Sequence, residues 1–208
     1  MPLDFKYHSV PDFLLEKYDA SERSGSFDTG VVYIDLTGYT KFTMSLIERG
    51  ADGIEQLSEA INNIFGPLVK VVYGQGGFIP HFSGDAFTAL YPIINSNQSY
   101  RQMLFSAQFI HNEFDLISRQ IKDEYLMNLG IKIGLAHGKV SWGVVGKELN
   151  EYYYFKGGAI DEAIRAAEDS DNVYISIGSS LEERLSDLPG DIIIKNPYSS
   201  WDKLELPT

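Results

Sequence analysis

The sequence predicts an α+β domain whose single sheet is mostly antiparallel and is covered by helices. Two observations lead to this prediction: β-type segments occur as hairpins, and helices with one apolar stripe stand between them. The expected order is strand, long helix, hairpin, helix, hairpin, helix and two more strands. With 208 residues, 44% hydrophobic and 13% aromatic, the chain can bury a proper core in one large domain or two small ones.

The first third of the chain is expected to hold a short helix, a loop, a strand and a long helix. Asp12 to Lys17 is expected to form the short helix, and residues 21–30 are rich in Ser and Gly and typical of a loop. Residues 30–36 are almost all apolar, which predicts a central strand buried on both faces. From Lys41 to Tyr73, apolar residues recur at steps of three and four, which predicts one helix.

Hairpins and helices alternate in the remainder. Residues 78–92 predict two strands joined by the turn 83–85, and residues 131–146 predict a second pair that bends at 137–139. A helix is expected between them over 101–122. The residues available for its buried face are Phe105, Phe109, Ile110, Phe114 and Ile117. The last expected elements are a helix over 159–168, a strand over 173–178, a helical segment over 179–185 and strands over 191–195 and 198–206.

Composition excludes several classes of function. A net charge of −12 argues against a general nucleic-acid binder and against a polybasic membrane surface. Cysteine is absent, which rules out disulfides, zinc–thiolate sites and a cysteine nucleophile. The first thirty residues lack the apolar core of a signal peptide, and no segment resembles a membrane span. We therefore expect a cytoplasmic, stand-alone domain without a nucleic-acid or membrane partner.

Two aspartates are candidates for a shared metal site. Asp35 lies at the end of the expected central strand, and Asp85 lies in the turn of the following hairpin. If the hairpin pairs with the central strand, both carboxylates emerge at the same edge of the sheet. Two close carboxylates repel each other unless a cation neutralises them, and Mg²⁺ takes one or two carboxylates together with substrate phosphates. The alternative is structural: Asp35 could cap the next helix, and Asp85 could be an ordinary turn residue.

Three blocks in register resemble the catalytic domain of class III nucleotidyl cyclases. They are VVYIDLTGYTKFT, GGFIPHFSGDAFTALYP, and IKIGLAHGKVSWGVVG followed by YYYFKGGAIDEAIRAAE. The resemblance covers about residues 28–178. It implies a ferredoxin-like sheet, an N-terminal extension over 1–27 and a catalytic domain over 28–208.

The resemblance also implies a mechanism and a set of site residues. Two Mg²⁺ or Mn²⁺ ions per active site would be held by Asp35, Leu36 and Asp85, and the turn 37–40 would bind phosphates. The ribose 3′-oxygen would attack the α-phosphorus and expel pyrophosphate, with Arg165 stabilising the developing charge. Two copies would form a head-to-tail homodimer with shared active sites. The phosphate-binding residues are expected to be Thr37, Gly38, Tyr39 and Thr40.

The chain departs from the family pattern where the base and the ribose are read. Adenylate cyclases of this class typically use a Lys and an Asp or Thr for adenine, and these positions fall on His81 and Tyr154. The ribose-orienting Asn falls on Asp161. Tyr39 and Tyr154 are bulky, which favours a one-ring base, and His81 or a Tyr hydroxyl could bond its carbonyl edge. The pattern also resembles the pyrimidine cyclases of bacterial Pycsar anti-phage systems, which implies cyclic UMP or cyclic CMP made as a signal for a separate effector.

Less specific interpretations remain for most of these residues. Arg165 could pair with Glu162 or Asp169 on its own helix, and residues 152–154 could be interface packing. Lys195 and Lys203 are both candidates for a phosphate contact, and the sequence does not choose between UTP and CTP. A purine cyclase with an atypical base pocket is one alternative function. A catalytically inactive, cyclase-like dimer that only binds nucleotide is another.

Overall fold

The structure, a computed structural model, describes residues 10–147, 150–169 and 174–186. In chain order, its elements are α1 (Asp12–Asp19), β1 (Ser24–Thr37), α2 (Tyr39–Ile47), α3 (Ala51–Gly74), β2 (Phe82–Ser83), β3 (Ala86–Pro92), α4 (Ser96–Tyr125), β4 (Gly130–Lys147), β5 (Asn150–Lys156), α5 (Gly158–Glu168), β6 (Ile175–Ile177) and α6 (Ser179–Ser186). The strands pair antiparallel in the order β2-β3-β1-β4-β5, and β6 pairs with β4 in parallel. This arrangement confirms the predicted α+β fold with one mostly antiparallel sheet.

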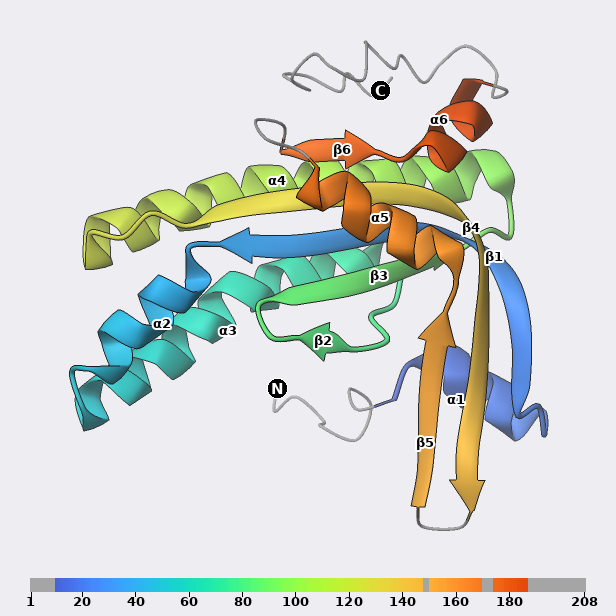
Figure 1. Cartoon of the computed structure of the whole chain (residues 1–208), viewed down its shortest axis with the longest axis horizontal. Helices are drawn as coiled ribbons and strands as arrows, with labels where there is room; N and C mark the ends of the chain where they lie inside the picture. Colours follow the sequence, from blue (N-terminus) through green and yellow to red (C-terminus); the bar gives the residue numbers. More distant parts are fainter. Residues whose placement is uncertain (1–9, 148–149, 170–173, 187–208) are drawn as a thin grey trace.

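Helices cover both faces of the sheet, and each face has its own core (Figure 1). On one face, β1 contributes Val32 and Ile34 to a core completed by α3 and α4. On the other face, Val31 of β1 packs with Ala163 of α5. Because successive side chains of a strand point to opposite faces, β1 serves both cores, as its apolar sequence predicts.

β4 is a single long strand, so the strand pair predicted for residues 131–146 is wrong. It pairs with all of β1, from Gly130 opposite Thr37 to Gly143 opposite Ser24. The second half of β4 therefore has an extended partner in residues 24–29, which the sequence suggested to be a loop. The hairpin instead joins β4 to β5, and Figure 1 shows it projecting beyond the rest of the sheet.

The helical layer differs from the prediction at two places. The expected helix from Lys41 to Tyr73 is two helices, α2 and α3, because Gly50 adopts a φ of 78° that favours glycine and ends the first helix. α4 begins at Ser96, earlier than expected, where the Asn95 side chain accepts a hydrogen bond from the Gln98 N–H. Phe109 is 40% exposed, so its expected place on the buried face of this helix is wrong. Ile110, Phe114 and Ile117 are buried as expected.

α1 belongs to the packed structure, which confirms the short helix expected near Asp12. Phe13 lies 5.1 Å from Phe78 and 4.6 Å from Phe27 between ring centroids, beneath the β4–β5 hairpin. β1 begins at Ser24, inside the segment expected to be an extension. The strands expected over 191–195 and 198–206, with Lys195 and Lys203, lie outside the described residues.

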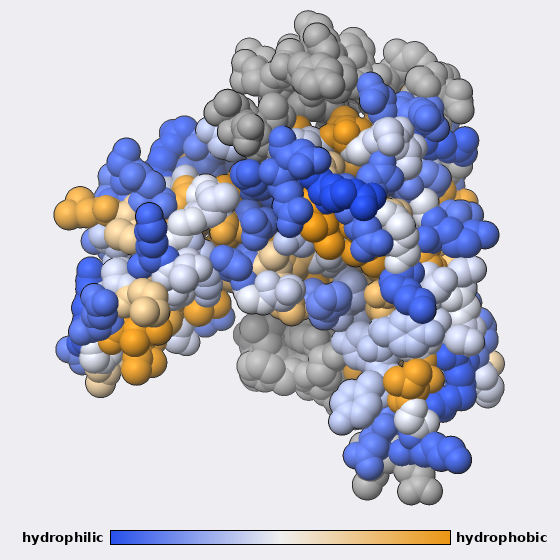
Figure 2. All heavy atoms as spheres, in the orientation of Figure 1, coloured by the Kyte–Doolittle hydropathy of each residue, from blue (hydrophilic) through white to orange (hydrophobic). Residues whose placement is uncertain are grey.

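The surface seen in Figure 2 is mainly hydrophilic, including the part over α5. Hydrophobic side chains gather near the outer end of α2 and α3, where Met44, Ile47 and Ile54 are each about half exposed. None of the described helices combines the length and the apolar composition needed to cross a membrane.

Candidate active site

Asp35 and Asp85 meet at the end of the central strand. Asp35 is paired with Ala86 of β3 on one side and with Lys132 of β4 on the other. Asp85 precedes β3 in the turn after β2, and its backbone carbonyl accepts a hydrogen bond of 3.3 Å from the Leu36 N–H. The pairing of the hairpin with β1 thus gives the proximity that the sequence suggested for these two residues.

Electrostatics at this pair favour a bound cation. Burial raises the pKa of Asp35, and the neighbouring charge of Asp85 raises it further, while Lys132 acts in the opposite direction. A half-buried carboxylate beside a second one is costly to ionise, and hard oxygen donors are the ligands that Mg²⁺ and Mn²⁺ prefer. The donor set therefore fits a divalent cation held by two carboxylates. Across the described ranges, no group of three or more His, Cys, Asp or Glu residues forms a larger metal-binding cluster.

The turn after Asp35 is built around Gly38. Its φ of 82° lies in the left-handed region, and an added Cβ would come within 2.6 Å of the Asn128 carbonyl oxygen. Gly38 is the N-cap of α2, and no side chain caps that helix, so the alternative in which Asp35 is the cap is wrong. The Leu36 side chain is buried in the core, which leaves only its main chain for a ligand.

Among the remaining turn residues, Tyr39 is the most constrained. Thr37 and Thr40 are exposed, and Tyr39 is half-buried as the first residue of α2. Its ring packs edge-on against Phe65 of α3, with 6.3 Å between centroids. Burial raises the pKa of the Tyr39 hydroxyl, and the negative charge of Asp85 raises it further. The hydroxyl is therefore close enough to Asp85 to interact with it electrostatically.

α5 presents Asp161 and Arg165 on its exposed side. Within the described part of the chain, Arg165 makes no ion pair, so the pairing with Glu162 or Asp169 that the sequence allowed is not formed. Glu162 instead accepts hydrogen bonds from the Ser179 hydroxyl at 3.1 Å and the Ser180 N–H at 2.9 Å. Its carboxylate therefore caps α6 and makes no ion pair with Arg165, whose charge nevertheless helps to lower the pKa of Glu162.

The positions expected to read the base lie on the β2 side and on the β4–β5 hairpin. His81 is exposed, just before β2, and Tyr154 of β5 is 38% exposed. Tyr153 points to the opposite face of β5, where its hydroxyl donates to the Pro80 carbonyl at 3.0 Å. Of the tyrosines at 152–154, Tyr153 is thus a packing residue, whereas Tyr154 is open to a ligand. No hydrogen bond or ion pair among the described residues joins His81, Tyr154 or Arg165 to the two carboxylates.

Sequence reasoning missed several residues around Asp35. Lys132 and Glu168 both act on the pKa of Asp35, and Tyr33 lies on the same face of β1. The Lys132 ammonium also donates to the Glu168 carbonyl oxygen at 3.4 Å. Side chains alternate along residues 131–134 of β4, which places Lys132 and Gly134 on one face of the strand. Only the register with β1 reveals that Asp35 lies on the same face of the sheet.

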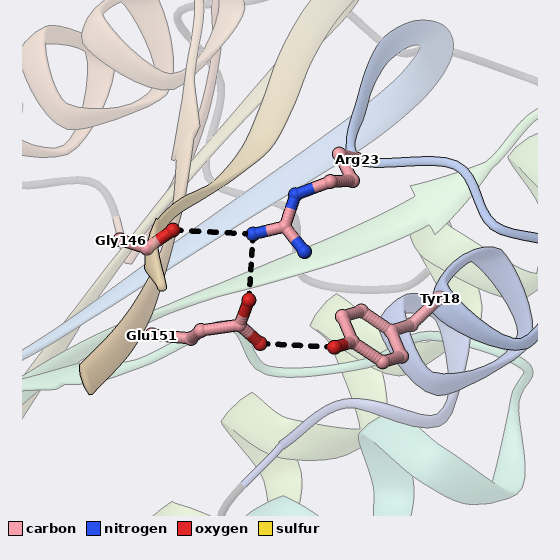
Figure 3. Close-up of polar contacts among 4 residues, drawn as sticks. All are labelled: Tyr18, Arg23, Gly146 and Glu151. Carbon is pink, nitrogen blue, oxygen red and sulfur yellow. Dashed lines mark hydrogen bonds and ion pairs between the residues drawn. The ribbon is translucent and has the colours of Figure 1, made fainter. Parts of the chain in front are cut away.

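The hairpin that carries Tyr154 is tied to the N-terminal segment by a polar cluster, shown in Figure 3. Arg23 donates to the Glu151 carboxylate at 2.7 Å and to the Gly146 carbonyl at 3.5 Å. The hydroxyl of Tyr18, on α1, donates to the other oxygen of Glu151 at 3.1 Å. We call Tyr18, Arg23 and Glu151 the hairpin clasp, because Tyr18 of α1 and Arg23, which precedes β1, both bind the Glu151 carboxylate of β5.

Comparison with curated proteins shows sequence similarity to adenylate cyclases. The chain is 28% identical over 169 residues to adenylate cyclase type 10 of Rattus norvegicus and 28% identical over 167 residues to that of Homo sapiens. These matches cover 77% of this chain and 10% of each relative, so the chain spans about a tenth of the length of the curated relatives it matches. No family model matches the sequence.

Solved structures give the same fold. The guanylyl cyclase Cya2 matches with a TM-score of 0.65 at 20% identity, over 86% of this chain and 89% of that one. The adenylyl cyclase CyaB from P. aeruginosa matches with a TM-score of 0.67 at 19% identity, over 85% and 91%. A class III adenylyl cyclase-like ATP-binding protein from Pseudomonas aeruginosa matches at 0.66 and 20%, over 77% of this chain and 35% of that one.

These comparisons confirm the resemblance stated from the three sequence blocks. The chain has the fold of class III nucleotidyl cyclase catalytic domains, with the curled antiparallel sheet and covering helices of that class.

Proposed function

We propose that this chain is a nucleotidyl cyclase that converts a nucleoside triphosphate into the 3′,5′-cyclic monophosphate and pyrophosphate. The observation that carries the proposal is the meeting of Asp35 and Asp85 beside a glycine turn, in a fold shared with adenylyl and guanylyl cyclases. Burial and mutual repulsion make this carboxylate pair unfavourable unless a cation is bound, which is typical of a functional site rather than a structural one.

Each proposed residue has a defined task. Asp35 and Asp85 would hold Mg²⁺ or Mn²⁺, two ions per site, with the main chain of Leu36 as a further oxygen donor. Such ions, when bound, neutralise phosphate charge and make the ribose 3′-hydroxyl easier to deprotonate. The turn 37–40 would bind phosphate oxygens. Asp161 would orient the ribose.

The reaction itself needs no covalent intermediate. The 3′-hydroxyl loses its proton to solvent water, its oxygen bonds to the α-phosphorus, and the bond from that phosphorus to the bridging oxygen of the β-phosphate breaks. Pyrophosphate leaves with the bond electrons. Arg165 would donate to the α-phosphate oxygens as their charge grows, a task suited to a permanently charged, forked donor.

The site would be completed by a second copy of the chain in a head-to-tail homodimer. One copy would supply Asp35 and Asp85, and the other Arg165 and Tyr154. This predicts complementation: Asp35→Asn and Arg165→Ala homodimers are each inactive, but a mixture restores activity. Random exchange of subunits makes half of the dimers heterodimers, and each heterodimer has one intact site of its two. About a quarter of the wild-type rate is therefore expected. Mixtures that stay inactive, although mass measurement shows exchanged dimers, would rule out sharing.

The favoured substrate is a pyrimidine nucleotide, UTP or CTP. Tyr154, His81 and Tyr39 stand where adenylate cyclases carry other residues, and the bulk of the two tyrosines supports a one-ring base. The Tyr39 ring packs against Phe65 of α3. The product would act as a second messenger in anti-phage defence and be sensed by a separate effector protein. We place the enzyme in the cytoplasm.

Two other functions have observations in their favour. A purine cyclase fits the names of the relatives, which are adenylate cyclases. An inactive nucleotide-binding module fits Asp161, whose exposed carboxylate would repel phosphate, and one similar structure is described as an ATP-binding protein.

One assay separates the three functions. The purified chain is incubated with each of the four nucleoside triphosphates and Mn²⁺ or Mg²⁺, and products are identified by mass spectrometry. Cyclic UMP or cyclic CMP that disappears in the Asp85→Asn variant supports the proposal. Efficient cyclisation of ATP or GTP alone supports a purine cyclase. Nucleotide binding without turnover, unchanged by Asp35→Asn, supports the inactive module.

A further inference from the structure

We propose that Lys156 is a specificity-determining residue that donates a hydrogen bond to a carbonyl oxygen of the nucleobase. The proposal rests on the proposed function, because it assumes that a nucleotide base lies against Tyr154. It names the base feature that the site would select: a ring carbonyl, present in uracil, cytosine and guanine and absent from adenine.

The first observation is a cation–π contact between Lys156 and Tyr154. The Lys156 ammonium lies 5.6 Å from the centroid of the Tyr154 ring, within the range of a cation–π contact. Both residues are on one face of β5, where they pair with Ser141 and Gly143 of β4. A Cβ at Gly143 would come within 2.7 Å of the Tyr154 hydroxyl, so the glycine makes room for the ring to lie across the hairpin.

The second observation is a pocket that begins at Lys156. It has a volume of about 420 Å³ and is lined by Ser141, Lys156, the Gly157-Gly158 pair and Asp161, among others. This size is within the range of small-molecule sites. Lys156 therefore stands between Tyr154, the expected base contact, and Asp161, the expected ribose contact.

The third observation is that the ammonium is available. Within the described residues, Lys156 forms no ion pair, and its ammonium lies over an aromatic ring, that of Tyr154. An ammonium has three donors and no acceptor, so it bonds a base carbonyl or a ring nitrogen but not an exocyclic amino group. We expect Lys156 to face a ring position that carries a carbonyl in the favoured base and no acceptor in adenine, and the two analogues below test this placement.

Binding of non-cyclisable analogues tests the proposal without turnover. The probes are 3′-deoxy-UTP and 3′-deoxy-ATP with Mn²⁺, titrated calorimetrically into the full chain. Lys156→Met is expected to weaken 3′-deoxy-UTP by roughly 10- to 100-fold, the effect of losing one charged hydrogen bond, and to change 3′-deoxy-ATP by less than about threefold. Lys156→Arg retains a charged donor and is expected to restore most of the affinity.

The matched control is Lys147→Met, which removes the same charge from the same face at the other end of the hairpin, opposite Asn150. It should bind both analogues like the wild type. In turnover, Lys156→Met should raise KM for UTP and leave kcat within about threefold, because Lys156 is not placed at the transferring phosphate. Equal losses for both analogues would mean a phosphate contact and would overturn the proposal, as would no loss at all.

The outcomes also separate this inference from the cyclase function. If the wild type makes no cyclic nucleotide but binds 3′-deoxy-UTP in a Lys156-dependent way, the cyclase function fails and the base contact stands. If it cyclises UTP and the Lys156→Met variant binds 3′-deoxy-UTP normally, the base contact fails and the cyclase function stands. If the wild type binds no analogue, both fail.

Discussion

Gly134→Ala tests whether the close packing of α5 on β4 sets the position of Arg165. A Cβ at residue 134 would lie 1.9 Å from the Ala163 carbonyl oxygen and 2.8 Å from the Ala167 nitrogen, where ordinary contacts begin near 3.4 Å. Because both atoms are main chain, one turn apart in α5, the helix must lift by about 1.5 Å as a body. Overpacking of this kind typically costs about 1–3 kcal/mol of folding stability.

The expected activity loss is larger than the stability loss suggests. Arg165 is carried by the same helix, and a misplacement of about 1 Å at a reacting centre can cost around 100-fold in rate. We expect the Tm of Gly134→Ala to fall by roughly 2–12 °C and its cyclisation rate by about 100-fold at temperatures where it remains folded. Denaturant unfolding, a thermal melt and the product assay measure the three quantities.

Gly66→Ala is the matched control. Gly66 lies inside α3, and nothing stands within 4 Å of its added Cβ. The same substitution there should stabilise the chain by about 0.5–1 kcal/mol, because a helix interior prefers alanine to glycine. If Gly134→Ala is as stable and as active as Gly66→Ala, the helix is not held by this contact, and the reasoning about Arg165 is wrong.

Three further predictions concern the charged residues. Burial and the charge of Asp85 raise the pKa of Asp35, so the ionised carboxylate destabilises the metal-free fold at neutral pH. Asp35→Asn should therefore raise the Tm of the metal-free chain at neutral pH. The same variant should lose the Tm increase that Mn²⁺ gives the wild type and should lower the cyclisation rate by at least about 100-fold. Burial alone would raise the pKa of Glu162, but hydrogen bonds from the Ser180 main chain and from the Ser180 and Ser179 side chains hold this pKa below its usual value. The resulting stabilisation is present at neutral pH and is lost as the pH falls through that pKa. Glu162→Ala should therefore lower the free energy of unfolding by about 1–3 kcal/mol at pH 7 and by much less in acid, measured by denaturant unfolding at both pH values. Arg23→Met removes the Arg23–Glu151 ion pair of the hairpin clasp, which solvent screens, so amide exchange in β5 should quicken while Tm barely changes. Unchanged exchange would mean that this ion pair does not hold the hairpin.

The fold class and the carboxylate pair could be predicted because they depend on local pattern. The apolar run before Asp35 marks a strand buried on both faces, and the Gly84-Asp85 turn marks a hairpin that pairs with it. Once these strands are adjacent, the meeting of the two aspartates follows from the register. The resemblance to class III cyclases added Arg165 and Asp161, which periodicity alone would have left as surface residues of a helix.

The length of β4 could not be predicted, because it depends on a partner far away in the chain. Residues 24–29 have the composition of a loop, and they form a strand because β4 offers its hydrogen-bonding edge along their whole length. Lys156 was missed for a related reason. Its contact with Tyr154 depends on the missing side chain at Gly143, on a neighbouring strand, which no spacing within β5 reveals.

The same long strand gives a physical reason for a second copy. Asp35 is opposite Lys132 on β4, and Tyr154 is opposite Gly143, so eleven steps of one strand separate them. At about 3.3 Å per residue the contour between them is roughly 36 Å, and even with the bend seen in Figure 1 this exceeds the reach of one nucleotide. A base at Tyr154 and phosphates at Asp35 of the same chain therefore cannot belong to one substrate. If both positions act in catalysis, two chains must bring opposite ends of their sheets together, and the mixed Asp35→Asn and Arg165→Ala dimers test that geometry.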